Sequence, residues 1–382
     1  MSFLLALPGI SLHGYGAIED LALLLAQKKW GKALIVTDEQ LAGLGLTDSL
    51  TASLQRQNIP YALFTGVAPN PTEEQVQAGL TAFRQQQCDF LIAFGGGSPI
   101  DSAKGIKILT ANPGRAIDYA GVGKVKQQGV PLVAINTTAG TAAEVTSNAV
   151  ITDSARQVKQ VIIDSRLIPD IAVDDPAVML GIPPGVTAAT GMDALTHALE
   201  AYVSKGAHAL TDANALEAIR LIHHWLPVAV AEGSNREARE MMACAQYLAG
   251  MAFNSAGLGL VHALAHQPGA THNLPHGVCN AILLPVVAAF NRPASVARFA
   301  RIAAALGVDT SAMDEEAASH AAIEALRQLA RQVGIPAGFR ELGIEEKDIE
   351  SWLDKALADP CAPANPRTAT REQVRELYQQ AL

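Results

Sequence analysis

Cysteine is scarce in this sequence, and the few cysteines are not paired by their spacing. The chain contains four of them, Cys88, Cys244, Cys279 and Cys361, and no two form a Cys-x-x-Cys motif. This spacing excludes a disulfide framework and a zinc knuckle, and it is typical of a protein from a reducing compartment. We expect the four to be small buried residues of a cytoplasmic protein.

Basic residues are also few. The 28 lysines and arginines are outnumbered by 37 aspartates and glutamates, which gives a formal net charge of −9 at pH 7. A surface that binds nucleic acid or an anionic membrane needs clustered Lys and Arg to neutralise phosphate. We therefore expect a small-molecule partner, with neither nucleic acid nor membrane.

Long apolar runs are missing as well. The longest run covers residues 281–290 and is interrupted by Pro285, whereas a membrane-spanning helix needs about 18 residues or more. The first seven residues carry no basic side chain and are followed by Pro8, so they do not resemble a secretory signal. These features again favour a cytoplasmic protein.

What the sequence has in quantity is apolar side chains. Of its 382 residues, 49% are hydrophobic and only 17% are charged, a balance that predicts a folded globular protein. The length exceeds that of one typical core, so two domains are expected. We predict domains 1–184 and 185–382, because the prolines of Pro183-Pro184-Gly185 interrupt regular structure.

The first domain alternates short β-branched runs with amphipathic helices. Continuous apolar runs of this kind are typical of strands covered on both faces. One connecting helix opens near Asn70 with a polar cap followed by two glutamates. Repetition of strand, helix and strand predicts an α/β domain with a parallel sheet. The expected strands are residues 33–37, 90–94, 132–135, 161–163 and 171–173.

The second domain is expected to be all helical. Beyond residue 185 the sequence contains Ala- and Leu-rich helical stretches and no convincing strand. Residues 359–367, which contain proline and aspartate, are expected to form a surface loop that leads into a last helix. The clearest helical stretches are residues 193–203, 211–226, 237–251 and 317–333.

A glycine triplet marks the first candidate ligand site. The strand at 90–94 runs into Gly95-Gly96-Gly97-Ser98-Pro99-Ile100-Asp101 and then into a helical stretch. Glycines let the backbone approach a ligand closely, and the amides at a helix start attract an anion, so a bound diphosphate fits. For the triplet alone, a tight strand-to-helix turn remains an alternative.

Polar residues follow two other expected strands. Asp38 ends the strand at 33–37, where a carboxylate can accept hydrogen bonds from an adenosine ribose and repel a 2′-phosphate, which favours NAD over NADP. Residues 136–141, with the sequence Asn-Thr-Thr-Ala-Gly-Thr, follow the strand at 132–135 and can hold ribose and phosphate. The alternatives are a turn-forming aspartate and a simple helix cap.

A second glycine motif receives little weight. Gly14 and Gly16 form a Gly-x-Gly that precedes the first good strand, and Glu19 stands where a third glycine would be. The usual dinucleotide fingerprint follows a strand and has three glycines.

Histidines and one aspartate cluster in the helical domain. Asp193 and His197 are four residues apart in a helical stretch, so they lie one turn apart on one face. His262 and His266 repeat this spacing, and His276 follows in a constrained turn. Imidazole and carboxylate suit zinc, ferrous iron, cobalt or manganese, and an open position would make the site catalytic. The ligand types alone do not name the metal.

In combination, these motifs resemble the iron-containing (group III) alcohol dehydrogenase family over nearly the whole chain. The motifs are Asp193-Ala-Leu-Thr-His197, the block 259–280 with its three ordered histidines, and Gly95-Gly-Gly-Ser98. The resemblance implies a Rossmann-like dinucleotide-binding α/β domain followed by an all-α metal-binding domain. It also implies NAD, a divalent metal with Fe²⁺ ahead of Zn²⁺, and a homodimer or larger assembly.

The resemblance assigns roles to particular residues. The metal ligands that it implies are Asp193, His197, His262 and His276. His266 lies beside the reacting centre but off the metal, as a candidate proton relay, with hydrogen bonding to a ligand as the alternative. The candidate cofactor-binding residues are Asp38, Asn70, Gly96, Gly97, Ser98, Asp101, Thr137, Thr138 and Lys159.

One departure from the family concerns residues 142–143. The family often has a glycine and a serine after the Thr-Thr-Ala-Gly-Thr run, whereas this chain has Ala142-Ala143. The added methyl group is tolerable unless the backbone there requires a positive φ.

The implied reaction is hydride transfer between NAD(H) and a short-chain primary alcohol or diol and its aldehyde. Hydride loss needs an alkoxide, and a divalent cation lowers the pKa of a bound hydroxyl. One alternative is a glycerol dehydrogenase or a dehydroquinate-synthase-like enzyme, the latter with clustered bases for its substrate. Another is a non-catalytic metal-binding protein. The basic side chains within residues 181–284 are only Lys205, Arg220, Arg236 and Arg239. This scarcity disfavours the dehydroquinate-synthase-like alternative, which needs clustered bases.

Overall fold

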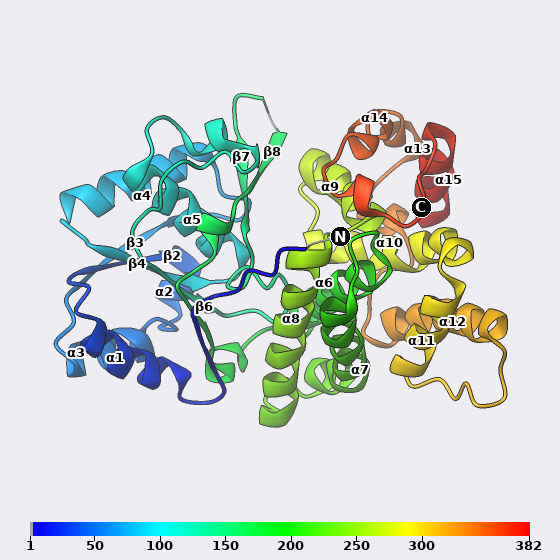
Figure 1. Cartoon of the computed structure of the whole chain (residues 1–382), viewed down its shortest axis with the longest axis horizontal. Helices are drawn as coiled ribbons and strands as arrows, with labels where there is room; N and C mark the ends of the chain where they lie inside the picture. The colour runs from blue at the N-terminus through cyan, green and yellow to red at the C-terminus, as the bar shows by residue number, and fades with distance from the viewer. Residues whose placement is uncertain (1–2, 157) are drawn as a thin grey trace. The chain divides into compact units, whose positions relative to one another are not determined.

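The computed structural model describes residues 3–156 and 158–382. These residues form two compact units. The first, an α/β unit, comprises Leu5–Thr138 and Ala142–Leu180. The second, a helical unit, comprises Gly181–Leu382 together with residues 3–4 and Ala139–Thr141. Figure 1 draws the α/β unit in blue to green and most of the helical unit in green to red.

A six-stranded sheet forms the centre of the α/β unit. Its strands lie in the order β1-β9-β6-β4-β2-β3, and all neighbouring pairs are parallel. The residues of β4 and the first five of β2 are buried, as expected for strands with helices on both faces. The strands are β1 (Ile10–His13), β2 (Ala33–Asp38), β3 (Tyr61–Val67), β4 (Phe90–Gly95), β6 (Leu132–Asn136) and β9 (Ile171–Asp174).

Helices cover both faces of this sheet. In Figure 1, α1 and α3 lie on one side of the strands, and α4 and α5 lie on the other. Val76, Leu80 and Phe83 of α4 are buried at helical spacing against the core. The arrangement confirms the predicted parallel α/β fold. The helices are α1 (Ala17–Lys28), α2 (Glu39–Gly43), α3 (Asp48–Arg56), α4 (Glu73–Gln85) and α5 (Gly97–Ala111).

One strand prediction was wrong in its placement. Residues 161–163 belong to β8 (Val158–Ile163), which lies in a separate three-stranded sheet with β5 (Gly121–Val122) and β7 (Asn148–Asp153). β7 and β8 form an antiparallel pair, and β8 is mostly half-buried. Its apolar run therefore does not mark a central strand covered on both faces.

The sheet order locates a ligand-binding edge. The chain passes from β2 to β3, then crosses back over β2 to β4, and continues in that direction to β6 and β9. The direction of winding reverses between β2 and β4. In open parallel sheets, ligands bind outside the carboxyl ends of the strands at such a reversal. The carboxyl ends here are Asp38 and Gly95.

The helical unit contains no strand among its described residues, as predicted. Helices α6, α7 and α8 pack against one another, and α10 packs against α6 and α9. Its helices are α6 (Pro184–Val203), α7 (Ala209–Ala231), α8 (Arg236–Ala256), α9 (Leu260–His272), α10 (His276–Asn291), α11 (Val296–Ala305), α12 (Glu315–Gln332), α13 (Glu346–Ile349), α14 (Leu353–Leu357) and α15 (Arg371–Ala381).

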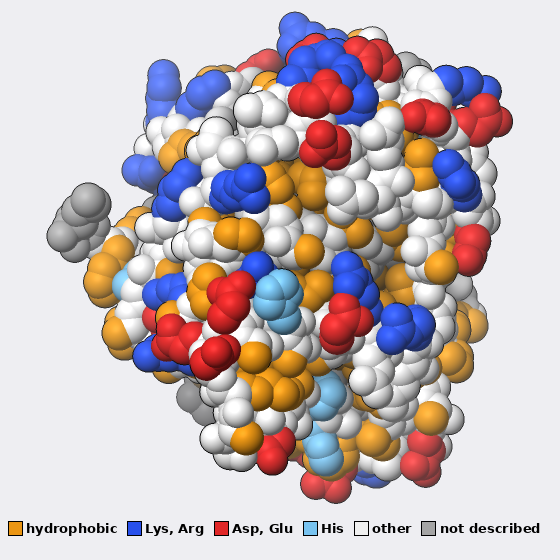
Figure 2. Space-filling model, turned by 90° about the vertical axis from the view of Figure 1, so that its right-hand side faces the viewer, with side chains coloured by type: hydrophobic (Ala, Val, Ile, Leu, Met, Phe, Trp, Pro, Cys, Tyr) orange, Lys and Arg blue, Asp and Glu red, His pale blue; other side chains and the backbone are white. Residues whose placement is uncertain are grey.

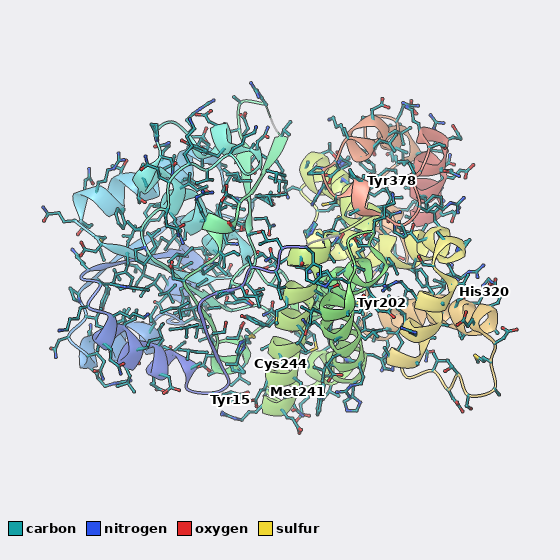
Figure 3. The ribbon with its side chains drawn as sticks, viewed as in Figure 1. Tyr15, Tyr202, Met241, Cys244, His320 and Tyr378 are labelled. Carbon is teal, nitrogen blue, oxygen red and sulfur yellow. The ribbon has the colours of Figure 1, made fainter. Side chains whose placement is uncertain are left out.

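The last helix supports α9. Tyr378 of α15, labelled in Figure 3, is buried and donates a hydrogen bond to the carbonyl of Leu264 at 2.8 Å. Its ring also packs against Trp352, with ring centroids 5.1 Å apart. The C-terminal helix therefore holds in place the helix that carries two of the candidate site histidines.

Residues 359–367 are not the surface loop that the sequence predicts. Asn365 is 2% exposed. Its Oδ1 accepts from the amide of Leu260 at 3.1 Å and from Asn291 Nδ2 at 2.9 Å. Pro360 and Pro363 are exposed, as in a surface loop, but the side chain of Asn365 faces inward, where buried amides need partners. The segment consequently anchors the start of α9.

Charged side chains of both signs are intermixed on the face that Figure 2 turns toward the viewer. Arg371 and Arg375 of α15 both pair with Glu350, at 2.6 and 3.0 Å. In α12, Arg327 pairs with Glu324. The opposite charges compensate one another across these helices.

One segment among the described residues is long and apolar enough to cross a membrane. It is His276–Ala294, which is α10 with the short turn that follows, and half of it is buried inside the protein. Helices α8 and α9 would pass the same test only as a pair bent by 105°. Core helices of soluble proteins satisfy this test of length and composition equally, so passing it does not identify the segment as a membrane span.

Candidate active site: a metal centre and a nucleotide-binding edge

Helix α6 supplies two side chains of the candidate metal centre. It begins at Pro184, because the fixed φ of proline suits the first helical turn. Asp193 and His197 lie four residues apart on its buried face and are 2% and 4% exposed. The sequence spacing places both side chains on one face of the helix, and the packing of the helical unit around α6 buries that face.

A sharp reversal of the chain brings the other histidines together. α9 carries His262 and His266, and it ends at Asn273, whose φ of 51° lies in the left-handed region. Pro275 then precedes His276, the first residue of α10. As a result the rings of His262 and His276 lie 5.3 Å apart by their centroids.

Three atoms that can ligate a metal lie close together. Asp193 Oδ1 lies 4.0 Å from His262 Nε2 and 3.7 Å from His276 Nε2, and the three atoms lie within 4.8 Å of one another. Burial works to raise the pKa of Asp193, but the imidazoles of His197, His276 and His262 outweigh it, and the pKa lies below its usual value. An ionised carboxylate with imidazole nitrogens suits a borderline divalent cation.

His197 lies beside this trio. Its ring stacks on His262, with centroids 4.7 Å apart, and on Phe253 at 4.4 Å. Burial lowers its pKa to about 4, so the imidazole is neutral at physiological pH and able to ligate a metal. The structure thus brings three of the four predicted ligands into one cluster and stacks the fourth against it.

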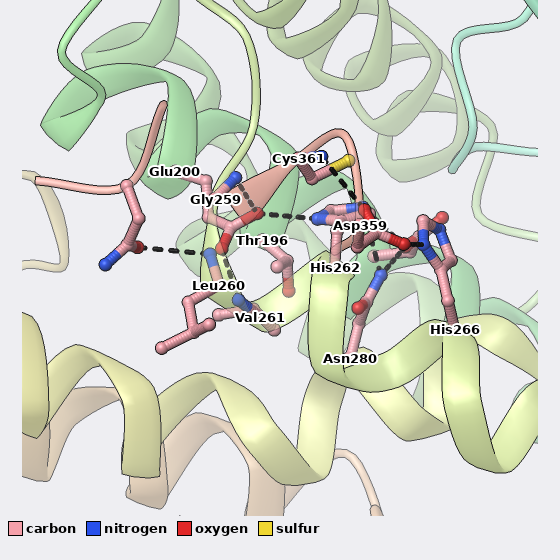
Figure 4. A network of polar contacts seen from close by, with 12 residues as sticks. Thr196, Glu200, Gly259, Leu260, Val261, His262, His266, Asn280, Asp359 and Cys361 are labelled. Atoms are coloured by element: carbon pink, nitrogen blue, oxygen red, sulfur yellow. Dashed lines mark hydrogen bonds and ion pairs between the residues drawn. The ribbon is translucent and has the colours of Figure 1, made fainter. Parts of the chain in front are cut away.

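Glu200 fixes the orientation of His262, as Figure 4 shows. One of its carboxylate oxygens accepts from His262 Nδ1 at 2.7 Å and from the amide of Gly259 at 2.9 Å. The other accepts from the amide of Val261 at 2.6 Å. Because Nδ1 carries the proton, the Nε2 lone pair of His262 points toward Asp193, which is the arrangement that a metal-binding histidine needs.

Asn280 of α10 lies at the same point. Its Nδ2 is 2.6 Å from Asp193 Oδ1 and 3.1 Å from Nε2 of both His262 and His276. An amide NH₂ group carries two hydrogens and cannot satisfy three acceptors. The surplus of acceptor atoms in a buried pocket is the chemistry that a divalent cation satisfies, so these residues fit the metal that their types predict.

His266 is held by a carboxylate outside this cluster. Its Nδ1 donates to Asp359 Oδ2 at 2.7 Å, and its ring stacks on His276 at 5.4 Å. Burial works to raise the pKa of Asp359, but hydrogen bonds from His266 and Cys361 lower it below its usual value. The charged carboxylate leaves Nε2 of His266 as a proton acceptor.

The α/β unit holds a cavity at the reversal of its sheet. The cavity has a volume of about 540 Å³. It lies at the carboxyl ends of β2, β3 and β4, where parallel sheets bind their ligands. Its lining residues are Asp38, Glu39, Gln40, Thr65, Gly66, Val67, Ala68, Pro69, Gly96, Gly97, Ser98 and Pro99.

Asp38 both caps a helix and lines the cavity, so it meets the two alternatives that its sequence position left open. Its Oδ1 caps the short helix α2 by accepting from the amide of Leu41 at 2.8 Å, as the turn-forming alternative requires. The same side chain lines the cavity, as a ribose-binding carboxylate would. The cap orients the carboxylate rather than removing it from the cavity.

The start of α5 forms another wall of the cavity. Gly96 is its N-cap, and no side chain caps the helix, so its first amides are open to an anion. A side chain at Gly96 would meet Thr138, whose nearest atoms lie 3.1 Å from an ideal Cβ. Glycine is therefore favoured where the loops after β4 and β6 approach, because a larger residue would need Thr138 to shift by a few tenths of an ångström. Gly97 and Ser98 lie at the cavity, whereas Thr137 and Thr138 follow β6 next to it.

Three further candidate cofactor residues do not line this cavity. Asp101 accepts from the amide of Val150 at 3.1 Å, and burial raises its pKa to about 6. Lys159 lies in β8, near enough to Asp101 to attract its charge. Asn70 adopts a left-handed φ of 58° just before α4, and its carbonyl accepts from Thr152. Asp101 and Asn70 connect parts of the α/β unit.

Gly14 and Gly16 do not precede the first strand, so this prediction from the sequence was wrong. β1 ends at His13, so the two glycines do follow a strand and precede α1. However, Asp175 Oδ2 accepts from the amides of Gly16 and Ile18, at 3.2 Å each. The protein's own carboxylate thus binds the amides at the start of α1. The motif at Gly14 and Gly16 therefore remains an unfavourable candidate for binding a dinucleotide.

Ala142 has a positive φ, which is the backbone conformation in which an added methyl group is unfavourable. Ala142 is fully buried and has a φ of 51°, in the left-handed region that favours glycine. An alanine in this conformation is strained by about 1–2 kcal/mol. The departure from the family pattern therefore has a structural cost next to the Thr137 and Thr138 segment.

Two family descriptions match this chain. The description "Iron-containing alcohol dehydrogenase" matches residues 8–176, and "Fe-containing alcohol dehydrogenase family, C-terminal" matches residues 187–382. The chain belongs to the iron-containing alcohol dehydrogenase family. It is therefore an oxidoreductase, as the motifs predict.

Relatives in this family are similar over their whole length. The chain is 47% identical to an NAD-dependent methanol dehydrogenase of Bacillus methanolicus, covering 98% of this chain and 99% of the relative. It is 45% identical to a 1,3-propanediol dehydrogenase of Citrobacter freundii, covering 98% and 97%. It is also 45% identical to a lactaldehyde reductase of Escherichia coli strain K12, covering 96% of each.

Solved structures of this family share the fold. A 1,3-propanediol oxidoreductase superposes with a TM-score of 0.98 at 44% identity, and an alcohol dehydrogenase from Oenococcus oeni does so with 0.98 at 38% identity. Each comparison covers 100% of both chains. The family name and the NAD-dependent relative agree with the predicted cofactors, NAD and a divalent metal with Fe²⁺ first.

The sequence reasoning missed three residues of the alcohol dehydrogenase site: Glu200, Asn280 and Asp359. Glu200 lies seven residues after Asp193, on the same face of α6, so helical spacing could have found it. Asn280 lies four residues after His276 on α10 in the same way. Asp359 is 93 residues from its partner His266, and no local pattern connects the two.

Proposed function

We propose that this chain is a metal-dependent, NAD-linked alcohol dehydrogenase that interconverts short-chain primary alcohols or diols and their aldehydes. The observation that carries the proposal is the convergence of Asp193, His262 and His276 beside His266. The relatives named for methanol, 1,3-propanediol and lactaldehyde support small, uncharged substrates.

Four side chains would hold the metal: Asp193, His197, His262 and His276. A divalent cation lowers the pKa of a hydroxyl bound to it by several units and polarises a carbonyl. Glu200 keeps the Nε2 lone pair of His262 available, and Asn280 hydrogen-bonds Asp193. The side chain of His276 is 33% exposed, which gives a small ligand access to the cluster.

His266 is the proton relay in this proposal. Asp359 keeps its Nδ1 protonated, so Nε2 takes a proton when an alcohol is oxidised and returns one when an aldehyde is reduced. The carboxylate stabilises the imidazolium during the transfer, as the aspartate of a catalytic triad does. Asp359 is therefore a positioning residue rather than a proton donor.

The edge of the sheet would bind the cofactor. Asp38 would accept hydrogen bonds from the adenosine ribose, and the amides at the start of α5, around Gly97 and Ser98, would bind the diphosphate. NAD held there would supply the acceptor for the hydride that leaves the carbon carrying the hydroxyl. A carboxylate at Asp38 repels the extra phosphate of NADP, so we propose NAD as the preferred cofactor.

We also propose that the protein is cytoplasmic, that it forms a homodimer or larger assembly, and that the domains divide between residues 184 and 185. The four cysteines, all in the described part of the chain, are not joined in disulfides, which supports the reducing compartment. α6 begins at Pro184, which supports a boundary close to this residue.

The deciding experiment combines metal analysis with an activity screen. The purified protein is stripped of metal, reloaded with Fe²⁺, Zn²⁺, Co²⁺ or Mn²⁺, and assayed for NAD reduction with short alcohols, diols and glycerol. We expect activity with one or more short primary alcohols that depends on the added metal. Asp193→Ala should lose the bound metal and all measurable turnover. Turnover in metal-free protein would contradict the proposal, and a preference for glycerol would favour the glycerol dehydrogenase alternative.

A further inference from the structure

A second group of metal-ligating side chains lies next to the first. A ring nitrogen of His266, a carboxylate oxygen of Asp359 and Sγ of Cys361 lie within 4.8 Å of one another. All three residues are labelled in Figure 4, near His262. The donor set differs from that of the first cluster because it contains sulfur.

The three side chains are held close by the backbone. Asp359 Oδ1 accepts from the amide of Cys361 at 2.9 Å, which folds this short segment so that carboxylate and thiol stand together. Asp359 Oδ2 lies 2.7 Å from His266 Nδ1. In a tetrahedral zinc site with bonds of about 2.0–2.3 Å, ligand atoms lie roughly 3.3–3.6 Å apart. Shifts of about 1 Å or less would therefore let these atoms share one ion.

We propose that His266, Asp359 and Cys361 form a second divalent-cation site that takes a thiophilic ion such as Zn²⁺. Imidazole, carboxylate and thiolate together bind zinc better than hard cations, since soft sulfur ligands select zinc and its neighbours. The Asp359 carboxylate and a Cys361 thiolate would balance the two positive charges of the ion. The group is only half-buried, with the side chain of His266 19% exposed, so an ion can reach it.

Occupation of this site would block the proton relay, and this consequence rests on the proposed function of His266. When the ion binds Nδ1, the proton of that nitrogen moves to Nε2, and the thiol proton of Cys361 leaves to solvent. No oxidation or reduction is involved. An Nε2 that carries the proton can no longer accept one from an alcohol. Excess zinc should therefore inhibit the enzyme without displacing the first metal.

The test uses Co²⁺ as a spectroscopic probe. The first cluster contains no sulfur, so filling it gives no sulfur-to-cobalt charge-transfer absorption. We expect that absorption to appear only with the second equivalent of Co²⁺ added to the full-length protein. It should be lost in Cys361→Ser and retained in Cys244→Ser, which changes the other half-buried cysteine, labelled in Figure 3. Asp359→Asn should weaken the second equivalent by at least about tenfold.

Each outcome has a separate meaning. The absence of the sulfur band, or its persistence in Cys361→Ser, overturns the second site. A band that follows the expected pattern supports the site. Zinc inhibition, measured on the metal-loaded enzyme relative to each variant's own activity, should be at least about tenfold weaker in Cys361→Ser. If the band is present and zinc does not inhibit, the site stands and the relay proposed for His266 is overturned.

Discussion

The metal centre of the helical unit is built from side chains, whereas the nucleotide-binding edge of the α/β unit is built largely from backbone. Asp193 and His262 are each 2% exposed, and their orientation depends on the buried partners Glu200 and Asn280. At the sheet edge, the amides at the start of α5 and the glycine Gly96 form the site, and the charged residues that line it are Asp38 and Glu39.

This difference has an energetic consequence. A buried polar side chain that loses its partner costs about 1–3 kcal/mol, and more if it is charged. A half-buried carboxylate such as Asp38 exchanges its partner for water at a lower cost. Substitutions should therefore have larger effects at the metal centre than at the sheet edge.

His197 should make the metal-free protein sensitive to acid. Its pKa is lowered by burial to about 4 in the folded protein but is about 6.5 when unfolded. Between these values the unfolded state binds more protons, so stability is full above pH 6.5 and falls as pH decreases toward 4. The free energy of unfolding should drop by about 3 kcal/mol over this window. Urea unfolding measured by circular dichroism checks it.

The matched variant is His197→Gln, which cannot titrate in this range. Its stability should depend less steeply on pH between 6.5 and 4 than that of the original protein. Identical slopes for the two proteins would show that His197 is not the group responsible.

Glu200→Gln should weaken metal binding by about 10–100-fold. A glutamine would place an NH₂ group against one of the N–H donors of His262, Gly259 and Val261, so the orientation of the histidine is lost. Competition with a chelator measures the affinity for Zn²⁺ or Fe²⁺. Glu217→Gln changes an exposed glutamate that pairs with Arg220 on α7 and should leave the affinity unchanged. Equal affinities in all three proteins would contradict the role of Glu200.

Asp38→Asn should shift cofactor preference by about tenfold, or about 1.4 kcal/mol. The amide oxygen can still cap α2, while the charge that repels a 2′-phosphate is removed. The ratio of kcat/KM with NADP to that with NAD should rise. Asp48→Asn, which removes a charge from the first turn of α3, serves as the control. A ratio that does not change in Asp38→Asn would exclude this residue from the ribose site.

Ala142→Gly should stabilise the protein by about 1 kcal/mol or slightly less. The substitution relieves the strain of a left-handed alanine, about 1–2 kcal/mol, and loses part of the gain to the greater freedom of glycine when unfolded. Thermal unfolding measures the change. Ala143→Gly is the matched control, because its φ is not positive, and it should destabilise instead. Stabilisation by both would point to a cause other than strain.

The sequence predicts the fold well where the residue pattern of a single strand or helix reveals how much of it is buried. The strands at 33–37 and 90–94 are continuous apolar runs and form the buried β2 and β4. β1 is only four residues long and half-buried, so no run marks it. The strand at 161–163 was assigned to the wrong sheet, since a short apolar run does not reveal its partners.

The candidate site follows the same rule. Asp193 and His197 are recognisable, as are His262 and His266, because helical spacing places each pair on one face of its own helix and their chemistry is distinctive. Asp359 could not be found, since its partner His266 lies 93 residues away and its own segment has the composition of a surface loop. Contacts between distant segments depend on the packing of α9 against α14 and the residues after it, which no local pattern contains.

Asp175 at the start of α1 has a consequence for how the proposed cofactor lies along the sheet. Of the two glycine-flanked helix starts at this edge, α1 already binds the protein's own carboxylate, and only α5 remains for a diphosphate. With the diphosphate fixed there and Asp38 on one side of it, the adenosine has a single direction available. The nicotinamide must then extend the opposite way, toward the threonines that follow β6.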